Sequence, residues 1–144
     1  MSILSRETKN AIENNNISYF ESVITNNNVN DCDGSGRTAL IHAADNGKLE
    51  IVQLLLDKGA NINYSSYIGG TSLLYAAGSG YLDIVQLLLD EGADINLSNN
   101  NGDTSLIIAA KYKNIEVVKL LIRKGANTSI VNKVIIPIKA IILG

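Results

Sequence analysis

The chain has 144 residues, of which 46% are hydrophobic and 18% charged, and its net charge is −2 at pH 7. This hydrophobic share excludes a disordered chain, and the length predicts a single domain, residues 1–144. The one cysteine excludes an internal disulfide and any metal site built from several cysteines, and it fits a reducing compartment. We therefore expect an intracellular protein, in the cytoplasm or, for a secreted effector, in the cytoplasm of a host cell.

Two classes of partner are disfavoured by the distribution of apolar and basic residues. The N-terminus lacks the apolar core of a signal peptide, and the most apolar run, Val134–Gly144, is too short to span a membrane. Nucleic-acid binding favours a basic stripe with interleaved aromatic residues, and only Lys111–Lys113 is of this kind. We therefore expect neither a membrane nor a nucleic acid as partner.

Residues 1–33 read as a degenerate copy of a unit that returns later in the chain. Ile17–Ile24 aligns with the apolar pattern of Leu49–Leu56. The preceding stretch, Ser5–Asn14, is predicted to form a first helix with Ser5 as its N-cap. Its polar composition suits the end of a stack, where one face meets water, and it predicts an N-terminal cap repeat.

The clearest signal in the sequence is a unit repeated at a fixed step of 33 residues. The threonines Thr38, Thr71 and Thr104 mark this step. Self-similarity at such a period is typical of a solenoid, in which each unit covers the apolar face of its neighbour. The three full repeats occupy residues 34–66, 67–99 and 100–132.

Each full repeat is predicted to contain two helices and a finger-like loop. A threonine caps the first, alanine-rich helix, and a glycine in the left-handed conformation ends the second helix. A further glycine at positive φ is expected in each loop. The second helices are predicted at Leu49–Lys58, Leu82–Glu91 and Ile115–Lys124. The glycines that end them are Gly59, Gly92 and Gly125, and the loop glycines are Gly36, Gly69 and Gly102.

The last stretch, residues 133–144, resembles the first helix of a further repeat whose second helix is missing. Its isoleucines and leucine cannot all be buried against the preceding repeat. Three interpretations stay open: a truncated solenoid, a fragment of a longer protein such as an enzyme, effector or channel, or an apolar C-terminus through which the chain self-associates.

The repeated pattern G-x-T-x-L-x-x-A-A, followed after a gap by L-L-x-x-G-A-[ND]-x-N, resembles the ankyrin repeat. The best copy matches it at Gly69, Thr71, Leu73, Ala76–Ala77, Leu87–Leu88, Gly92–Ala93 and Asn96. The resemblance implies an all-α ankyrin-repeat α-solenoid of helix-turn-helix units with β-hairpin-like finger loops. The sequence departs from the family pattern directly after each threonine, where the usual proline is replaced by Ala39, Ser72 and Ser105.

No group of residues in the sequence predicts catalysis, so we expect neither an enzyme nor a cofactor or metal site. His42 is the only histidine, and it shares a repeat position with Tyr75 and Ile108, which favours a half-buried packing role. Cys32 has no second thiol and lies in a finger loop, where a free cysteine, exposed or partly buried, is the simpler interpretation.

The remaining function is protein recognition, which the resemblance places on a concave face made of finger tips and first helices. Tyr67 and Ile68 stand out there, because a loop tip has no packing reason to carry two such side chains and tyrosine is enriched among interface anchors. The alternative for Tyr67 is a ring that leans on the next finger. The predicted partner-binding residues are Ser35, Arg37, Asp45, Asn46, Tyr67, Ile68, Gly70, Tyr75, Ser79, Asn100, Asn101, Asp103, Lys111 and Tyr112.

Overall fold

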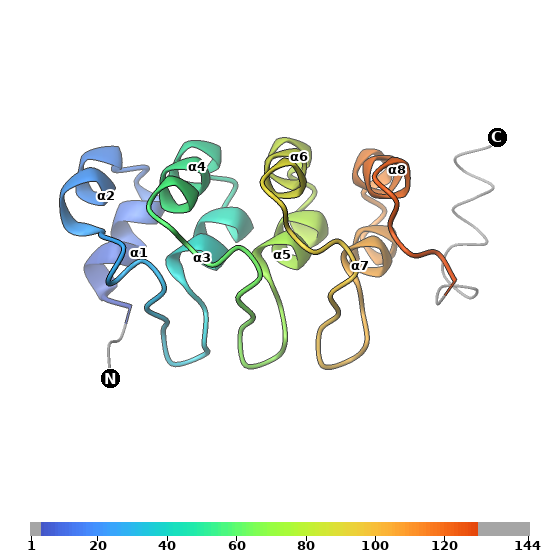
Figure 1. Cartoon of the computed structure of the whole chain (residues 1–144), viewed down its shortest axis with the longest axis horizontal. Coiled ribbons are helices and arrows are strands. Elements are labelled where there is room, and N and C mark those ends of the chain that lie inside the picture. Colours follow the sequence, from blue (N-terminus) through green and yellow to red (C-terminus); the bar gives the residue numbers. More distant parts are fainter. Residues whose placement is uncertain (1–3, 130–144) are drawn as a thin grey trace.

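The computed structural model describes residues 4–129, and within this range it contains eight α-helices and no β-strand. The helices are α1 (Arg6–Glu13), α2 (Ile17–Val23), α3 (Ala39–Asp45), α4 (Leu49–Asp57), α5 (Ser72–Ser79), α6 (Leu82–Asp90), α7 (Ser105–Lys111) and α8 (Ile115–Arg123). Figure 1 shows two rows, with the inner helices α1, α3, α5 and α7 next to the projecting loops and the outer helices α2, α4, α6 and α8 on the side away from the loops. This is the predicted all-α solenoid.

Threonine caps start the inner helices as predicted. The hydroxyl oxygen of Thr38 accepts a hydrogen bond from the backbone N–H three residues later, at 3.3 Å. Thr71 and Thr104 accept the equivalent bonds at 3.3 and 3.4 Å, and Ser5 does the same for α1 at 3.1 Å. Each such cap contributes about 1 kcal/mol to helix stability, because it satisfies an otherwise unpaired N–H group.

The core is continuous along the stack and aliphatic except for Phe20 of α2. Pairs of small alanines allow α3 to pack against α5 and α5 against α7. Burying each Leu or Ile is worth roughly 1.5–3 kcal/mol, and here the neighbouring repeat supplies the cover. The buried alanine pairs are Ala43–Ala44, Ala76–Ala77 and Ala109–Ala110.

The outer helices end one residue earlier than the sequence predicts. Lys58, Glu91 and Lys124 are C-caps rather than helical residues. The following glycines carry the chain away in the predicted left-handed conformation, with φ of 89° at Gly59 and 94° at Gly92. Gly125 has the same conformation, at 89°.

Three loops project from the inner row, and an isolated antiparallel bridge closes each at its base. We name them finger 1 (residues 32–38), finger 2 (residues 65–71) and finger 3 (residues 98–104). Side-chain oxygens of Asp33, Ser66 and Asn99 accept hydrogen bonds from backbone N–H groups across each tip.

Backbone hydrogen bonds also join each finger to the next. The N–H of Tyr67 donates to the carbonyl of Ser35 at 3.0 Å, and the N–H of Asn100 donates to the carbonyl of Ile68 at 3.0 Å. The fingers therefore form one connected row. The predicted truncated repeat, residues 133–144, and the self-association expected from it lie outside the described residues.

The turn between the two helices of a repeat needs a residue with positive φ. Gly47 and Gly80 supply it in the first two full repeats, with φ of 73° and 79°. In the third repeat Lys113 takes the same conformation, with φ of 59°. A side chain with a Cβ is strained there, at a cost of roughly 1–2 kcal/mol.

Replacing Lys113 by glycine is expected to stabilise the protein by about 0.5–1 kcal/mol, because the relieved strain exceeds the added freedom of the unfolded chain. Urea unfolding followed by circular dichroism measures this change. Lys113→Ala is the matched control, since it removes the long side chain but keeps the Cβ. Equal midpoints for the glycine variant and the wild type would contradict the strain at this turn.

Candidate functional site

A groove of about 540 Å³ lies between fingers 2 and 3 and the helices α5 and α7. We call it the central groove. Nine predicted partner-binding residues line it: Asp45, Ile68, Gly70, Tyr75, Ser79, Asn101, Asp103, Lys111 and Tyr112. Gly78 also lines it, and the sequence prediction left out three others: Leu74, Asn99 and Ile108.

Five predicted residues lie outside the central groove, and most of them hold the scaffold together. The carbonyls of Ser35 and Tyr67 accept hydrogen bonds from the following finger, the second of them from the Asn100 amide at 2.9 Å. The Asn46 amide donates to the carbonyl of His42 at 2.7 Å. Ser35, Asn46 and Asn100 thus have structural roles. The fifth residue, Arg37, belongs to a polar network described below.

Tyr67 combines the two roles that the sequence leaves open for it. Its ring lies against Gly36, since a Cβ built on that glycine would be 2.5 Å from a ring carbon. The ring therefore leans on the preceding finger rather than the next one. It is nevertheless 61% exposed, so most of its surface is available to a partner.

Large exposed apolar side chains gather beside the central groove. Ile68 is 64% exposed and Tyr112 is 69% exposed, and both line the groove. Apart from Tyr67, the remaining ones among the described residues are 39–44% exposed and belong to the outer helices: Val23, Leu49 and Leu82.

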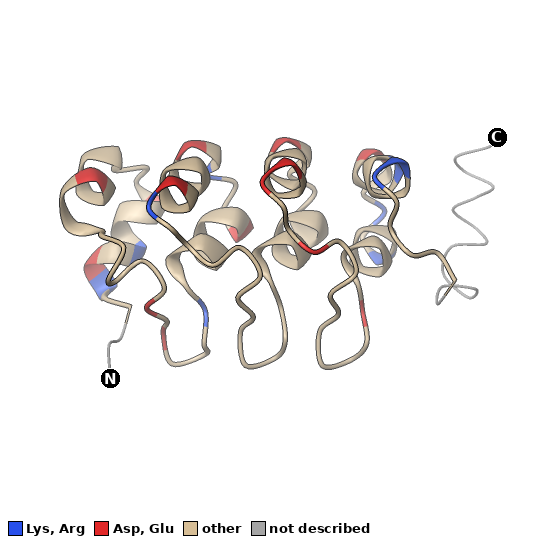
Figure 2. Ribbon diagram, viewed as in Figure 1, with Lys and Arg blue, Asp and Glu red and all other residues tan. Residues whose placement is uncertain are grey.

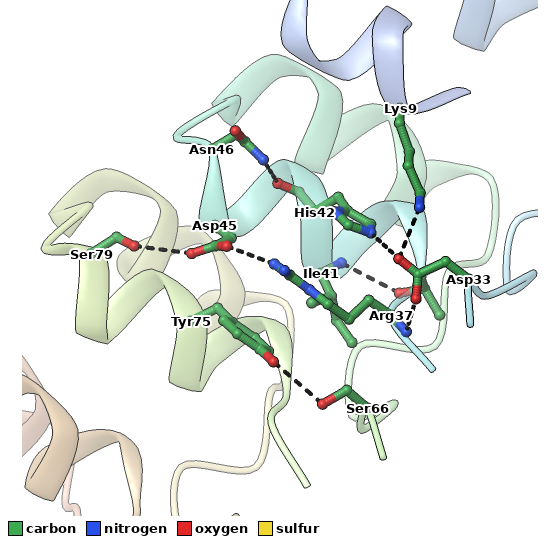
Figure 3. A network of polar contacts seen from close by, with 11 residues as sticks. Lys9, Asp33, Arg37, Ile41, His42, Asp45, Asn46, Ser66, Tyr75 and Ser79 are labelled. Atoms are coloured by element: carbon green, nitrogen blue, oxygen red, sulfur yellow. Dashed lines mark hydrogen bonds and ion pairs between the residues drawn. The ribbon is translucent and has the colours of Figure 1, made fainter. Parts of the chain in front are cut away.

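We number the full repeats 1 (residues 34–66), 2 (residues 67–99) and 3 (residues 100–132). A polar network centred on Arg37 bounds the groove on the side of repeat 1 (Figure 3). The Arg37 guanidinium donates to Asp45 Oδ2 at 2.6 Å and lies 4.5 Å from the centroid of the Tyr75 ring. The other oxygen of Asp45 accepts from the Ser79 hydroxyl at 3.2 Å. Arg37 thus links finger 1, α3 and α5 through an ion pair and a cation–π contact.

A second ion pair bounds the groove on the opposite side. Lys111 Nζ lies 2.8 Å from Asp103 Oδ2, which joins α7 to finger 3. These two residues occupy the same repeat positions as Arg37 and Asp45, 66 residues later, but with the charges exchanged. In the repeat between them both positions are glycine, Gly70 and Gly78.

The charges themselves are unevenly distributed around the groove. In Figure 2, finger 2 and α5 carry no charged residue, whereas finger 1, finger 3 and the outer helices do. The sequence accounts for this, because no Asp, Glu, Lys or Arg occurs between Lys58 and Asp83.

His42 contributes to a second network that the sequence does not predict. Its Nε2 lies 2.8 Å from Asp33 Oδ2, and Lys9 Nζ of α1 lies 3.2 Å from the same oxygen. Burial disfavours the ionised Asp33, but hydrogen bonds from His42, from the Arg37 and Ser35 backbone and from Lys9 outweigh it. They hold the pKa of Asp33 well below its ordinary value.

The same surroundings keep His42 neutral. Burial lowers the pKa of His42 below its ordinary value of 6.5, and the hydrogen bond to Asp33 opposes this only in part. A neutral imidazole can donate from Nε2 to the carboxylate, which fixes its tautomer. The histidine is half-buried as predicted, but it also ties α3 to finger 1.

The described residues, 4–129, hold no cluster of three or more His, Cys, Asp or Glu side chains that could bind a metal ion. In the same part of the chain no helix is long and apolar enough to cross a membrane.

The family model described as "Ankyrin repeats (3 copies)" matches residues 9–99 and 68–132 of the chain. Together the two matches extend over residues 9–132. No curated protein matches the chain significantly.

The stability of the protein is expected to fall as the pH is lowered from about 7.5 to about 5.5. The folded state binds a proton at His42 less readily than the unfolded state, so acid favours unfolding through this residue. The pKa of Asp33 is low enough that this carboxylate stays ionised over the same range. Thermal unfolding at several pH values measures the effect.

The control for this prediction is His42→Gln, which removes the only histidine of the chain. Its melting temperature should be nearly constant over the same pH range. A wild-type melting temperature that rises on acidification would show instead that the protonated His42 is the form favoured by folding.

Proposed function

Because the chain belongs to the ankyrin repeat family, whose members generally act by binding other proteins, we propose that it recognises a partner protein without catalysing a reaction. The binding surface is the concave face, which consists of fingers 1–3 and the exposed side of the inner helices.

One observation carries this proposal. The most exposed large apolar side chains of residues 4–129 are Tyr67, Ile68 and Tyr112, at 61%, 64% and 69%. All three belong to the concave face, and two of them line its groove. Leaving such side chains in water has no benefit for folding, and tyrosine is enriched among the residues that dominate interface energetics.

The mechanism is recognition by a preorganised surface. Backbone hydrogen bonds join finger 1 to finger 2 and finger 2 to finger 3, each at 3.0 Å. The ion pairs Arg37–Asp45 and Asp103–Lys111 tie fingers 1 and 3 to helices. Since these loops are already ordered, binding adds little entropic cost for ordering them, and a few anchor residues suffice.

Affinity capture from a lysate of the source cell tests the proposal. The wild-type chain is compared with the variant Tyr67→Ala/Ile68→Ala/Tyr112→Ala. We expect the variant to recover specific partners at least about tenfold less well, because the three replaced side chains are the proposed anchors. Quantitative mass spectrometry measures the recovery.

The matched control is Leu49→Ala/Leu82→Ala, which removes exposed apolar surface from the outer helices α4 and α6 instead. This control should recover the same partners as the wild type. Circular dichroism establishes that both variants are folded. Equal recovery by the wild type and the triple variant would contradict the assignment of the concave face.

A further inference from the structure

We propose that the central groove receives one bulky apolar side chain of the partner, inserted beside Gly70 and Gly78. This inference rests on the proposed function, since it names the kind of side chain that the concave face would bind.

The two flanking repeats show which side chains cover the positions that correspond to Gly70 and Gly78. In repeat 1 the Arg37 side chain leaves finger 1 and covers the inner helices, where it meets Asp45 at 2.6 Å and the Tyr75 ring at 4.5 Å. In repeat 3 the pair Asp103–Lys111 covers the same place at 2.8 Å. An ion pair between finger and helix therefore closes the surface in both repeats.

Repeat 2 lacks this cover, because both positions are glycine. Neither glycine has a positive φ, and Gly78 lies inside α5. Both instead allow close packing, because a Cβ on Gly70 would be 2.6 Å from a ring carbon of Tyr75 and a Cβ on Gly78 would be 2.9 Å from a methyl carbon of Ile108. Glycine inside a helix costs roughly 0.5–1 kcal/mol relative to alanine. Both glycines line the central groove, and no ion pair between finger and helix covers it in this repeat.

The wall of the central groove next to Gly70 and Gly78 carries apolar side chains. Tyr75 and Ser79 lie near the guanidinium of Arg37, which belongs to repeat 1. The corresponding residues beside the groove, 33 residues later, are Ile108 and Tyr112. Ile108 lies close to the gap, since a Cβ built on Gly78 would be 2.9 Å from its methyl carbon. Ile68 stands on the rim at 64% exposure.

The charges near the groove favour an apolar rather than a basic side chain. Both lining carboxylates already have counter-ions, Asp45 in Arg37 and Asp103 in Lys111. At the position that corresponds to Asp45, an inserted arginine or lysine would find Gly78 and no carboxylate. A bulky apolar side chain needs no counter-ion and would cover Ile108, Tyr112 and Ile68.

A displayed library of random dodecapeptides, selected on the full chain, tests the inference. We expect the enriched peptides to share one bulky apolar residue. Replacing that residue by alanine should weaken binding about tenfold to a hundredfold, which corresponds to the loss of one buried large apolar side chain. Isothermal titration calorimetry with the synthetic peptides measures the affinities.

Variants of the chain locate the bound side chain. Gly70→Arg/Gly78→Asp rebuilds in repeat 2 the ion pair of repeat 1 and should abolish peptide binding. Because the new Cβ atoms would displace Tyr75 and Ile108, folding of this variant is checked by its melting curve. Tyr112→Ser, at a side chain that is 69% exposed, is a second test with little effect on folding. Leu82→Ser on the outer face is the control and should bind normally.

The outcomes separate this inference from the proposed function. Enriched peptides that share a basic residue would overturn the inference. So would peptides that bind the folded Gly70→Arg/Gly78→Asp variant and the Tyr112→Ser variant as tightly as they bind the wild type. The proposed function would stand in that case if binding were still lost in Tyr67→Ala/Ile68→Ala/Tyr112→Ala. Binding that is insensitive to all these variants would contradict both, and a library without enriched peptides would overturn the inference.

Discussion

The structure depends on one constraint: no repeat can bury its own apolar face. Each pair of helices is covered by the next pair, and this is possible only if the same surface returns at a constant step of 33 residues. The constraint fixes the threonine caps, the alanine pairs of the inner helices and the left-handed glycines such as Gly59 and Gly92. A stable core thereby arises from short helices, none of which would be stable alone in water.

The same constraint separates the residues that fold the chain from those that are free for binding. Positions occupied by the same residue in every repeat lie wholly or partly in the core, cap a helix or form a turn. The positions of Arg37 and Asp45 change from an ion pair to two glycines, Gly70 and Gly78, and then to an ion pair of reversed polarity. This variation leaves the stacking unchanged, yet it covers the concave face in two repeats and opens it in the one between them. A constant scaffold can thus carry a surface that is specific to one partner.

Periodic and local features of the fold were predictable from the sequence. Thr38 and its equivalents cap helices through the N–H three residues later, so the signal lies within one turn of chain. Contacts between repeats were not predictable in this way. The pairing of Asp33 with Lys9 and His42 joins a loop to two different helices, and the Tyr75 ring receives a guanidinium from the preceding repeat. Nine residues that line the central groove were predicted from their repeat positions, whereas the packing of Ile108 against Gly78 joins two repeats and was not.

The central claim is that binding occurs where the repeats differ, on the concave face between fingers 2 and 3. Mapping of amide chemical shifts in the ¹⁵N-labelled chain, recorded with and without a captured partner segment, tests it most directly. The account predicts that the shifted signals cluster at Ile68, Gly70, Gly78 and Tyr112 and leave α4 and α6 unchanged. Shifts confined to the outer helices, with the signals of the groove unaffected, would contradict it.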